Sequence, residues 1–423
     1  MRNNSFEWLK LDNAAKIFPG QNSRAWSNVF RVGVQLKEEI DPDILQKALD
    51  RTLKRIPGFA VRIRNGFFWH YFEKNPEVCP IMPDIKNLCY RINFKENKGY
   101  LFRLYYHGNR ISVDIYHALS DGYGGSVFLS TLVGEYLRLK GYSISHNKVV
   151  LDVNEPPRKE EIEDAYDRYA CSKVKYNRND KWVYHSIGTK LPPHMCNYVI
   201  GIMSFKQVHE ISKKYGVTVT ELFAAMLLDV HYRKQLRESK KQREVSVQIP
   251  VNLRKAFPSE TLRNFVLCLR VKIDPNMGEY TFEEILRSVS LQLRLVNDPK
   301  FLNSMMTQNM KIERNGVMKY LPIGLKDLAV GIGFMITAEQ TTSTLISNLG
   351  PVVLPDDMME HVERFFFFTG PGKVNGARTA VVSLGDSLAF TFSNCYEESD
   401  IEREFFTRLV KMGVHVKIES NRD

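Results

Sequence analysis

The sequence lacks the patterns that mark several common protein classes. Its six cysteines are dispersed over 423 residues and none forms a Cys-x-x-Cys pair, so no structural zinc site is predicted. Dispersed cysteines in a chain of this length are typical of reduced thiols in a cytoplasmic protein. No apolar run reaches the ~18 residues that a membrane-spanning helix needs, and residues 1–20 show no apolar segment of a secretory signal. We therefore expect a cytoplasmic protein without a transmembrane segment.

The charge balance is basic, but it is not concentrated in one place. The formal net charge is +11, which suits an anionic ligand, an acidic carrier protein, nucleic acid or an anionic lipid surface. The lysines and arginines are scattered, form no basic tail and show no stripe interleaved with aromatic residues. Nucleic-acid binding is therefore not predicted. An anionic ligand and a merely solvated basic surface both remain open.

Hydrophobic residues make up 43% of the chain and charged residues 25%, which is typical of an ordered globular protein. Asp41 and Pro42 form a helix start, and leucines at helical spacing predict a helix over 41–57. Asn65-Gly66 between two β-prone runs predicts a hairpin with a type I′ turn.

Residues 109–141 repeat the strand-then-helix order. Apolar and polar residues alternate over 110–116, which predicts a half-buried strand. A glycine-rich turn, ALSDGYGG, follows. Ser126 is a plausible cap for the next helix, and Gly141 ends it.

A polar, charge-dense segment divides the chain. Residues 154–191 read as a linker, part of which could be a solvated helix. It separates a first half, 1–153, from a second half, 192–423. Both halves mix helices with strands, so we expect an α/β (α+β) protein with two halves of similar construction.

The most informative residues are His117 and Asp121, which lie four residues apart at the end of a predicted strand. A neutral imidazole can take a proton from an alcohol or amine. Asp121 could accept from backbone amides or pair with an arginine. A lone histidine at a strand end is more often structural than catalytic, so the spacing alone does not decide. A metal site is disfavoured because no third ligand lies nearby in the sequence.

The segment HALSDG resembles the His-x-x-x-Asp-Gly active-site motif of the chloramphenicol acetyltransferase superfamily. This superfamily includes alcohol acetyltransferases, wax ester synthases, polyketide-associated acyltransferases and nonribosomal peptide condensation domains. The stretches RIPGFAVRI, IPVNLRKAFPSETLRNF and SNLGPVVLP are similar to further segments of the superfamily, in the same order. The resemblance extends over nearly the whole chain and is closest to the bacterial alcohol acetyltransferase-like group.

The resemblance implies two chloramphenicol-acetyltransferase-like halves that form a pseudo-dimer with a central tunnel. His117 is expected to act as the catalytic base near the middle of that tunnel. Asp121 is expected to be structural and to pair with an arginine, for which we choose Arg254. Gly122 is expected to let the loop turn beside the substrate channel. The candidates for donors to the oxyanion are, in the second half, Thr344, Ser347 and Asn348.

The implied reaction moves an acyl group from acyl-CoA to an alcohol or amine without a bound cofactor or metal. The alternatives are an acyl carrier protein as donor, acting in trans, and a binding protein that keeps the fold. Condensation domains usually carry a second histidine before the catalytic one, where this chain has Tyr116, and the DFGWG motif of the plant branch is absent. The pseudo-dimer also implies a monomer with a complete active site.

Overall fold

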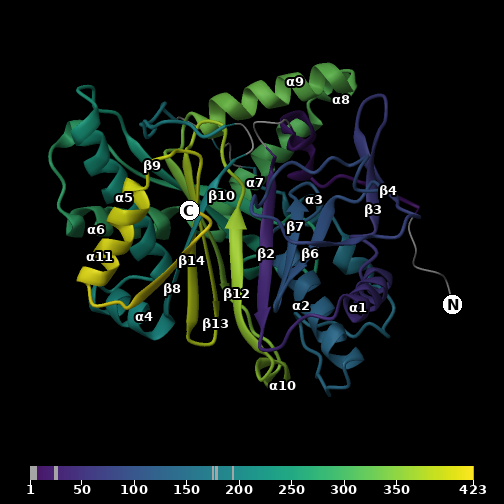
Figure 1. Cartoon of the computed structure of the whole chain (residues 1–423). Coiled ribbons are helices and arrows are strands. Elements are labelled where there is room, and N and C mark those ends of the chain that lie inside the picture. Colours follow the sequence, from purple (N-terminus) through teal and green to yellow (C-terminus); the bar gives the residue numbers. More distant parts are fainter. Residues whose placement is uncertain (1–6, 23–26, 174–175, 177–179, 193–194, 423) are drawn as a thin grey trace.

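The computed structural model describes residues 7–22, 27–173, 176, 180–192 and 195–422. Within these residues the strands form three sheets, of three, five and seven strands. Helices cover the outer faces of the two larger sheets, and one long helix crosses the top of the molecule (Figure 1). The fold is therefore mixed α/β, as the sequence predicts.

The five-stranded sheet belongs mainly to the first half of the chain. Its order is β12 (Val362–Thr369), β2 (Val29–Leu36), β7 (Arg110–Tyr116), β6 (Phe102–His107) and β5 (Ile81–Pro83). All neighbours are antiparallel except β5 and β6. The edge strand β12 comes from the second half, so the two predicted halves share a strand. Nothing in the sequence patterns indicates this exchange.

The seven-stranded sheet is built from the second half. Its order is β10 (Val266–Ile273), β9 (Val245–Asn252), β11 (Thr344–Pro351), β13 (Ala377–Leu384), β14 (Ser387–Asn394), β8 (Asn197–Ser204) and β15 (Val416–Ser420). Strand β11 is parallel to both of its neighbours. Thr391 and Ser393 of β14 donate to Phe367 O and Thr369 O of β12, each at 2.6 Å, and so join the two sheets.

The longer helices pack on the sheets in two groups. The first-half group is α1 (Pro42–Arg55) and α2 (Gly122–Leu139), and the second-half group is α4 (Phe205–Lys214), α5 (Val219–Glu238), α6 (Phe282–Val296) and α11 (Asp400–Lys411). Helices α7 (Pro299–Arg314), α8 (Gly316–Tyr320) and α9 (Ile323–Phe334) follow α6, and the π-helix η6 (Met335–Glu339) continues α9. The remaining short elements are β1 (Trp8–Lys10), β3 (Val61–Asn65), β4 (His70–Lys74), α3 (Ala165–Tyr169), α10 (Asp356–Met359), η1 (Ala15–Ile17), η2 (Pro19–Gln21), η3 (Lys159–Ile162), η4 (Leu253–Lys255) and η5 (Pro275–Met277).

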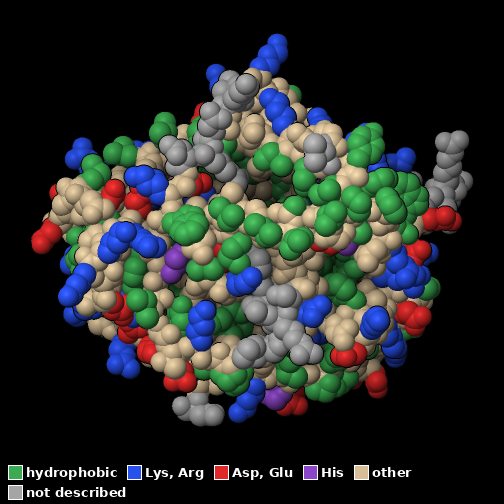
Figure 2. All heavy atoms as spheres, turned by 90° about the horizontal axis from the view of Figure 1, so that it is seen from above, with side chains coloured by type: hydrophobic (Ala, Val, Ile, Leu, Met, Phe, Trp, Pro, Cys, Tyr) green, Lys and Arg blue, Asp and Glu red, His purple; other side chains and the backbone are tan. Residues whose placement is uncertain are grey.

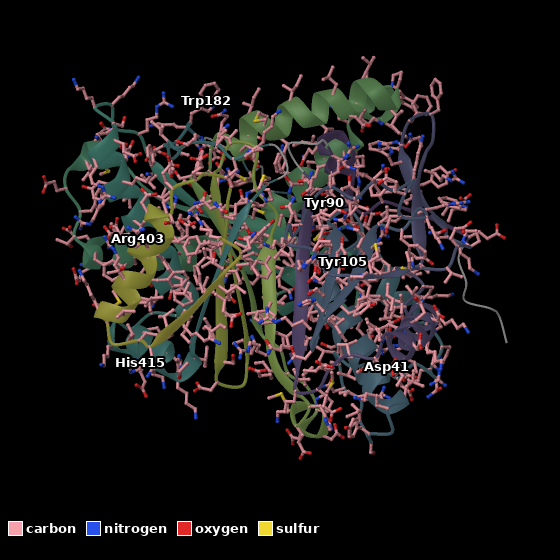
Figure 3. All side chains as sticks on the ribbon, viewed as in Figure 1. Asp41, Tyr90, Tyr105, Trp182, Arg403 and His415 are labelled. Atoms are coloured by element: carbon pink, nitrogen blue, oxygen red, sulfur yellow. The ribbon has the colours of Figure 1, made fainter. Side chains whose placement is uncertain are left out.

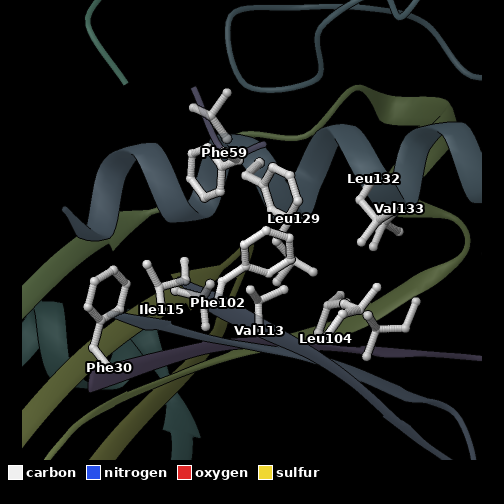
Figure 4. Close-up of a cluster of buried hydrophobic side chains, with 14 of the residues drawn as sticks. Phe30, Phe59, Phe102, Leu104, Val113, Ile115, Leu129, Leu132 and Val133 are labelled. Carbon is white, nitrogen blue, oxygen red and sulfur yellow. The ribbon is translucent and has the colours of Figure 1, made fainter. Parts of the chain in front are cut away.

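The core of the first half forms where α2 covers the five-stranded sheet (Figure 4). Phe59 stacks on Phe128 at 4.3 Å between ring centroids, and Phe102 meets Phe128 edge-on at 5.2 Å. Burial of aromatic and branched side chains is the main stabilising contribution here. No described helix has the combination of length and apolar composition that a bilayer crossing requires.

Several local predictions are confirmed. Helix α1 begins at Pro42, and the Asp41 side chain accepts from two backbone amides of its first turn. Strands β3 and β4 form the predicted hairpin. The strand over 110–116 is β7, and Gly141 follows α2 with a positive φ of 100°. All six cysteines are free thiols.

Three predictions are wrong in detail. Asn65 still belongs to β3 and pairs with His70, and the Gly66 N–H donates to Trp69 O, so the turn centres on the two phenylalanines between them rather than on a type I′ Asn-Gly. Strand β7 is buried on both faces instead of half-buried: α2 packs on one face, and on the other Asp114 pairs with the buried Arg31 and Arg103. Ser126 is buried inside α2, and Asp121 caps the helix instead.

The segment predicted as a linker contains η3 and α3, and part of it is buried. Glu161 pairs with Arg55 through two 2.7 Å hydrogen bonds. The Tyr166 hydroxyl donates to Val266 O at 2.8 Å, and its ring packs on Phe265. The charge-dense sequence therefore does not make this segment fully solvent-exposed, because the carboxylate of Glu161 is buried against Arg55.

Candidate active site

His117 follows the last residue of β7. Its backbone N–H donates to Asn28 O at 2.9 Å, which extends the pairing of β7 with β2 by one residue. The imidazole stacks on Phe18 with ring centroids 4.8 Å apart, and Phe30 meets it edge-on at 5.1 Å. The strand and the two phenyl rings thus fix the position of the imidazole.

A hydrogen-bond chain sets the tautomer of His117. Asn264 lies on the loop before β10, and its Oδ1 is 3.0 Å from His117 Nδ1. Asn264 Nδ2 donates to Asp12 Oδ2 at 3.3 Å, so the amide oxygen is the atom that faces the imidazole. Nδ1 must therefore carry the proton, and Nε2 carries the lone pair. This is the tautomer that a general base needs.

Burial lowers the pKa of His117 below its ordinary value of 6.5, while a hydrogen bond to its own backbone, the charge of Asp121 and the hydrogen bond to Asn264 act in the opposite direction. The lowered pKa keeps the imidazole neutral at pH 7. A neutral imidazole can accept a proton from a bound hydroxyl or amine. The electrostatics of the site therefore favour the basic form.

Asp121 holds two backbone segments and an arginine together beside the cavity. It is the N-cap of α2, where its side chain accepts from Gly124 N at 3.0 Å, and it also accepts from Phe265 N at 2.9 Å. Its third partner is Arg254, whose Nη1 donates at 2.8 Å. Only 1% of the Asp121 side chain and 7% of that of Arg254 are exposed. The ion pair joins the start of α2 to the second half of the chain.

Arg254 extends this link toward the histidine. Its guanidinium donates to Thr261 O at 2.8 and 2.9 Å and to Arg263 O at 2.6 Å. It also lies over the Tyr123 ring, 4.6 Å from the centroid. The carbonyls that it binds lie one and three residues before Asn264. Asp121 and Arg254 therefore position the residue that orients His117.

A glycine is required at one position of the turn, and a second glycine is closely packed. A Cβ on Gly124 would overlap the carbonyl oxygen of Leu262. A Cβ on Gly122 would lie 3.2 Å from Leu349 Cδ1 and 3.3 Å from Phe367 Cζ, where the wall of the cavity passes. Because Gly122 and Gly124 have no side chains, the turn can lie this close to Leu262, Leu349 and Phe367 of the second half.

His117 opens on a cavity of about 620 Å³. Its walls come from β2 and β12 of the five-stranded sheet, from β9, β10 and β11 of the seven-stranded sheet, and from α7 and α9. Most of the lining surface is apolar, and polar or charged side chains are spread among it, with Asp121 and Asn264 on the side of the histidine and Gln248, Arg270 and Arg378 on the seven-stranded sheet. A cavity of this size with a mainly apolar surface is typical of a small-molecule site.

The structure separates the three oxyanion candidates. Alternate residues of a strand point to opposite faces, and Ser347 lines the cavity. Thr344 and Asn348 do not line it: Thr344 donates to Ala377 O at 2.8 Å, and Asn348 donates to Thr220 Oγ1 at 2.8 Å. Both side chains are engaged elsewhere, so only Ser347 is placed to meet a substrate.

Sequence reasoning missed Asn264, Asp12 and Phe18. The segment containing Asn264 was recognised as similar to the superfamily, but the role of this residue as partner of His117 was not inferred. Asp12 and Phe18 carry no sequence signal, because they reach the site from a part of the chain far from the motif. Burial raises the pKa of the Asp12 carboxyl against the opposing charge of Arg263.

Comparison with known proteins finds the fold but no sequence relative. No protein-family model matches the chain, and no curated protein sequence does. Among solved structures, polyketide synthase associated protein 5 from Mycobacterium tuberculosis has a TM-score of 0.64 at 16% identity, covering 97% of this chain and 98% of that one. F. graminearum TRI101, complexed with coenzyme A and deoxynivalenol, has a TM-score of 0.63 at 11% identity, covering 97% and 100%.

The first condensation domain of the CDA synthetase gives a TM-score of 0.63 at 12% identity, covering 96% of this chain and 97% of that one. The chain has the chloramphenicol acetyltransferase-like fold. The predicted fold class is therefore confirmed. The pseudo-dimer with a central tunnel stays a prediction.

Proposed function

We propose that the protein transfers an acyl group from a thioester, acyl-CoA, to a hydroxyl or amine, with neutral His117 as general base. The observation that carries the proposal is the fixed tautomer of His117: Asn264 holds Nδ1 at 3.0 Å and leaves the lone pair on Nε2. The position of the ring on the wall of a large apolar cavity and the fold shared with acetyltransferases add support.

The reaction proceeds in a complex with both substrates bound. His117 Nε2 removes the acceptor proton while the oxygen or nitrogen attacks the thioester carbonyl. The tetrahedral intermediate collapses with loss of the thiolate, and the protonated His117 returns the proton to the sulfur. General-base catalysis contributes roughly 10²- to 10⁴-fold. Positioning of the two substrates and donors to the oxyanion supply the rest, and Ser347 is the candidate donor.

Asp121, Gly122 and Arg254 have positioning roles in this proposal. The ion pair and the cap fix the turn after His117, and the glycine leaves room beside the cavity. The halves at 1–153 and 192–423, joined through 154–191, act as one catalytic unit in a monomer. The small-molecule acceptor and the acyl donor both occupy the cavity between them.

The test is acceptor-dependent thiol release. Purified protein is mixed with acyl-CoA donors from acetyl to palmitoyl and with pooled alcohols and amines, and free thiol is measured. Release that requires an acceptor supports the proposal and identifies the donor. A second arm replaces coenzyme A with an acyl carrier protein, because the net charge of +11 suits an acidic carrier. Release in neither arm would leave a binding role for the fold.

A further inference from the structure

Helix α9 turns its charged residues toward the protein. Lys326 is buried: its Nζ donates to Phe68 O at 2.6 Å and lies 3.3 Å from the centroid of the Trp69 ring. Asp327 accepts from His70 Nε2 at 3.0 Å. These two are the only charged residues of the helix. An ordinary surface helix shows the reverse arrangement, with charges outward and apolar residues inward.

The outer face of this helix carries a continuous apolar row. Leu325, Leu328, Ile332 and Ile336 follow one another at spacings of three, four and four residues, and 57%, 62%, 53% and 48% of their surfaces are exposed. This spacing places Leu325, Leu328 and Ile332 on one side of α9, and Ile336 follows them on η6, which continues the helix. We call these four residues the outer stripe. The view from above shows hydrophobic side chains gathered over this region, with lysines and arginines around them (Figure 2).

Aromatic residues and lysines stand at both ends of the outer stripe. Exposed Tyr320 precedes α9, and Lys319 Nζ lies 5.4 Å from its ring centroid. At the other end, exposed Trp182 follows Lys181, and the next residue donates to the carbonyl of Gln340 just after η6. Figure 3 shows Trp182 at the level of α9. Tryptophan, tyrosine and lysine at the edges of an apolar surface are typical of contact with a lipid interface.

The inner face of α9 is the roof of the cavity. Val330 and Phe334 are among its lining residues. The helix is held close to the chain below it, because a Cβ on Gly331 would lie 3.0 Å from Gly20 O. Phe18 lies two residues before Gly20, and its ring stacks on the imidazole of His117. One helix thus separates the outer stripe from the cavity of His117.

We propose that the outer stripe docks on the surface of a lipid bilayer that contains anionic headgroups, with α9 lying in the plane of the interface. A bilayer fits better than a second copy of the chain, because two copies of net charge +11 repel each other whereas anionic lipids attract the protein. The terminal aromatic and lysine residues fit the headgroup layer. The docking does not depend on the proposed reaction.

The test is co-sedimentation of the full chain with phosphatidylcholine vesicles, with and without phosphatidylglycerol. The variant Leu328→Glu/Ile332→Glu changes the outer stripe without touching residues that line the cavity. Its matched control is Leu291→Glu/Leu295→Glu, an equally spaced and exposed pair on α6. The wild type and the control should bind the anionic vesicles. The α9 variant should bind at least about tenfold more weakly, because two aliphatic side chains no longer enter the apolar layer.

Failure of the wild type to bind either vesicle overturns the proposal, as does equal binding by the α9 variant. Light scattering adds a third check: a wild-type dimer that the α9 variant alone converts to a monomer would assign the stripe to self-association and overturn docking. Thiol release from a short-chain donor without vesicles should be equal in all three proteins. Vesicle binding without any turnover would refute the proposed reaction and leave the docking intact.

Discussion

Helices α2 and α9 are both apolar and both touch the cavity, but they differ in how much of each helix is buried. In α2 every residue from Gly124 to Leu137 is buried. In α9 Lys326 is the only buried residue. Helix α2 has a side-chain cap from Asp121, whereas Pro322 before α9 provides none.

The difference shows that apolar composition alone does not place a helix in the core. Burial of α2 follows from glycines that let it approach the second half, and from an ion pair that holds its first turn. The position of α9 follows from where its two charged residues find partners. We expect the largest effects from changes at the anchored start of α2 and at the histidine beside it, and smaller ones from changes in α9.

Asp121→Asn should remove the charge that anchors α2. Breaking a buried ion pair costs about 3–5 kcal/mol, and the Asp121–Arg254 pair is almost fully buried. We expect a loss of stability of this order in urea unfolding, together with reduced turnover. The control is Asp41→Asn at the exposed cap of α1, where asparagine caps equally well. Equal stability of the two variants would show that the ion pair does not anchor α2.

Asn264→Ala should remove the hydrogen bond that fixes the tautomer of the His117 imidazole. Without the partner at Nδ1 both tautomers become populated, so we expect kcat to fall about 10- to 100-fold, less than loss of the base itself. KM should change little, since the ring remains between its two phenyl neighbours. An unchanged kcat in steady-state assays would remove Asn264 from the mechanism.

Matched glycine substitutions should separate the two helices directly. Gly124→Ala forces a methyl group against Leu262 O, so we expect a cost of about 1–3 kcal/mol. Gly333→Ala in α9 meets nothing within 4 Å, and the higher helix propensity of alanine should stabilise it by up to about 1 kcal/mol. Urea unfolding measures both. Effects of the same sign would contradict the close packing of α2 or the open setting of α9.

The pH dependence should report the buried setting of His117. Because burial lowers the pKa of this group, its basic form persists to pH values below 6.5. The acid limb of kcat/KM should therefore lie below pH 6.5, with a flat profile through neutrality. An acid limb above pH 6.5 would mean that the ring is solvated or paired with a charge in the working enzyme.

Local signals in the sequence predicted local structure well. Asp41 and Pro42 marked the start of α1 because capping depends on neighbouring residues only. Ser126 was the wrong cap, since the Asp121 side chain accepts from Gly124 N and the helix already begins at Gly122. The hairpin was predicted, but its turn moved by two residues because Asn65 stays paired in β3.

The parts of the site that depend on distant contacts could not be predicted. The motif identified His117 and Asp121, and the resemblance suggested Arg254 as the partner that lies 2.8 Å from Asp121. Asn264 reaches His117 across 147 residues and Asp12 reaches Asn264 across 252. Strand β12 likewise joins a sheet formed by the other half. Such contacts arise from the assembled fold, and no periodicity or spacing encodes them.

The measurement that tests the account most directly compares wild type with His117→Ala in acceptor-dependent thiol release, at pH 7 and with the best donor from the panel. The account predicts a loss of about 10²- to 10⁴-fold with little change in the thermal melt, because the hydrogen bond that links the His117 side chain to the second half of the chain is the one to Asn264. A variant that keeps a rate near that of the wild type would contradict the assignment of His117 as the base.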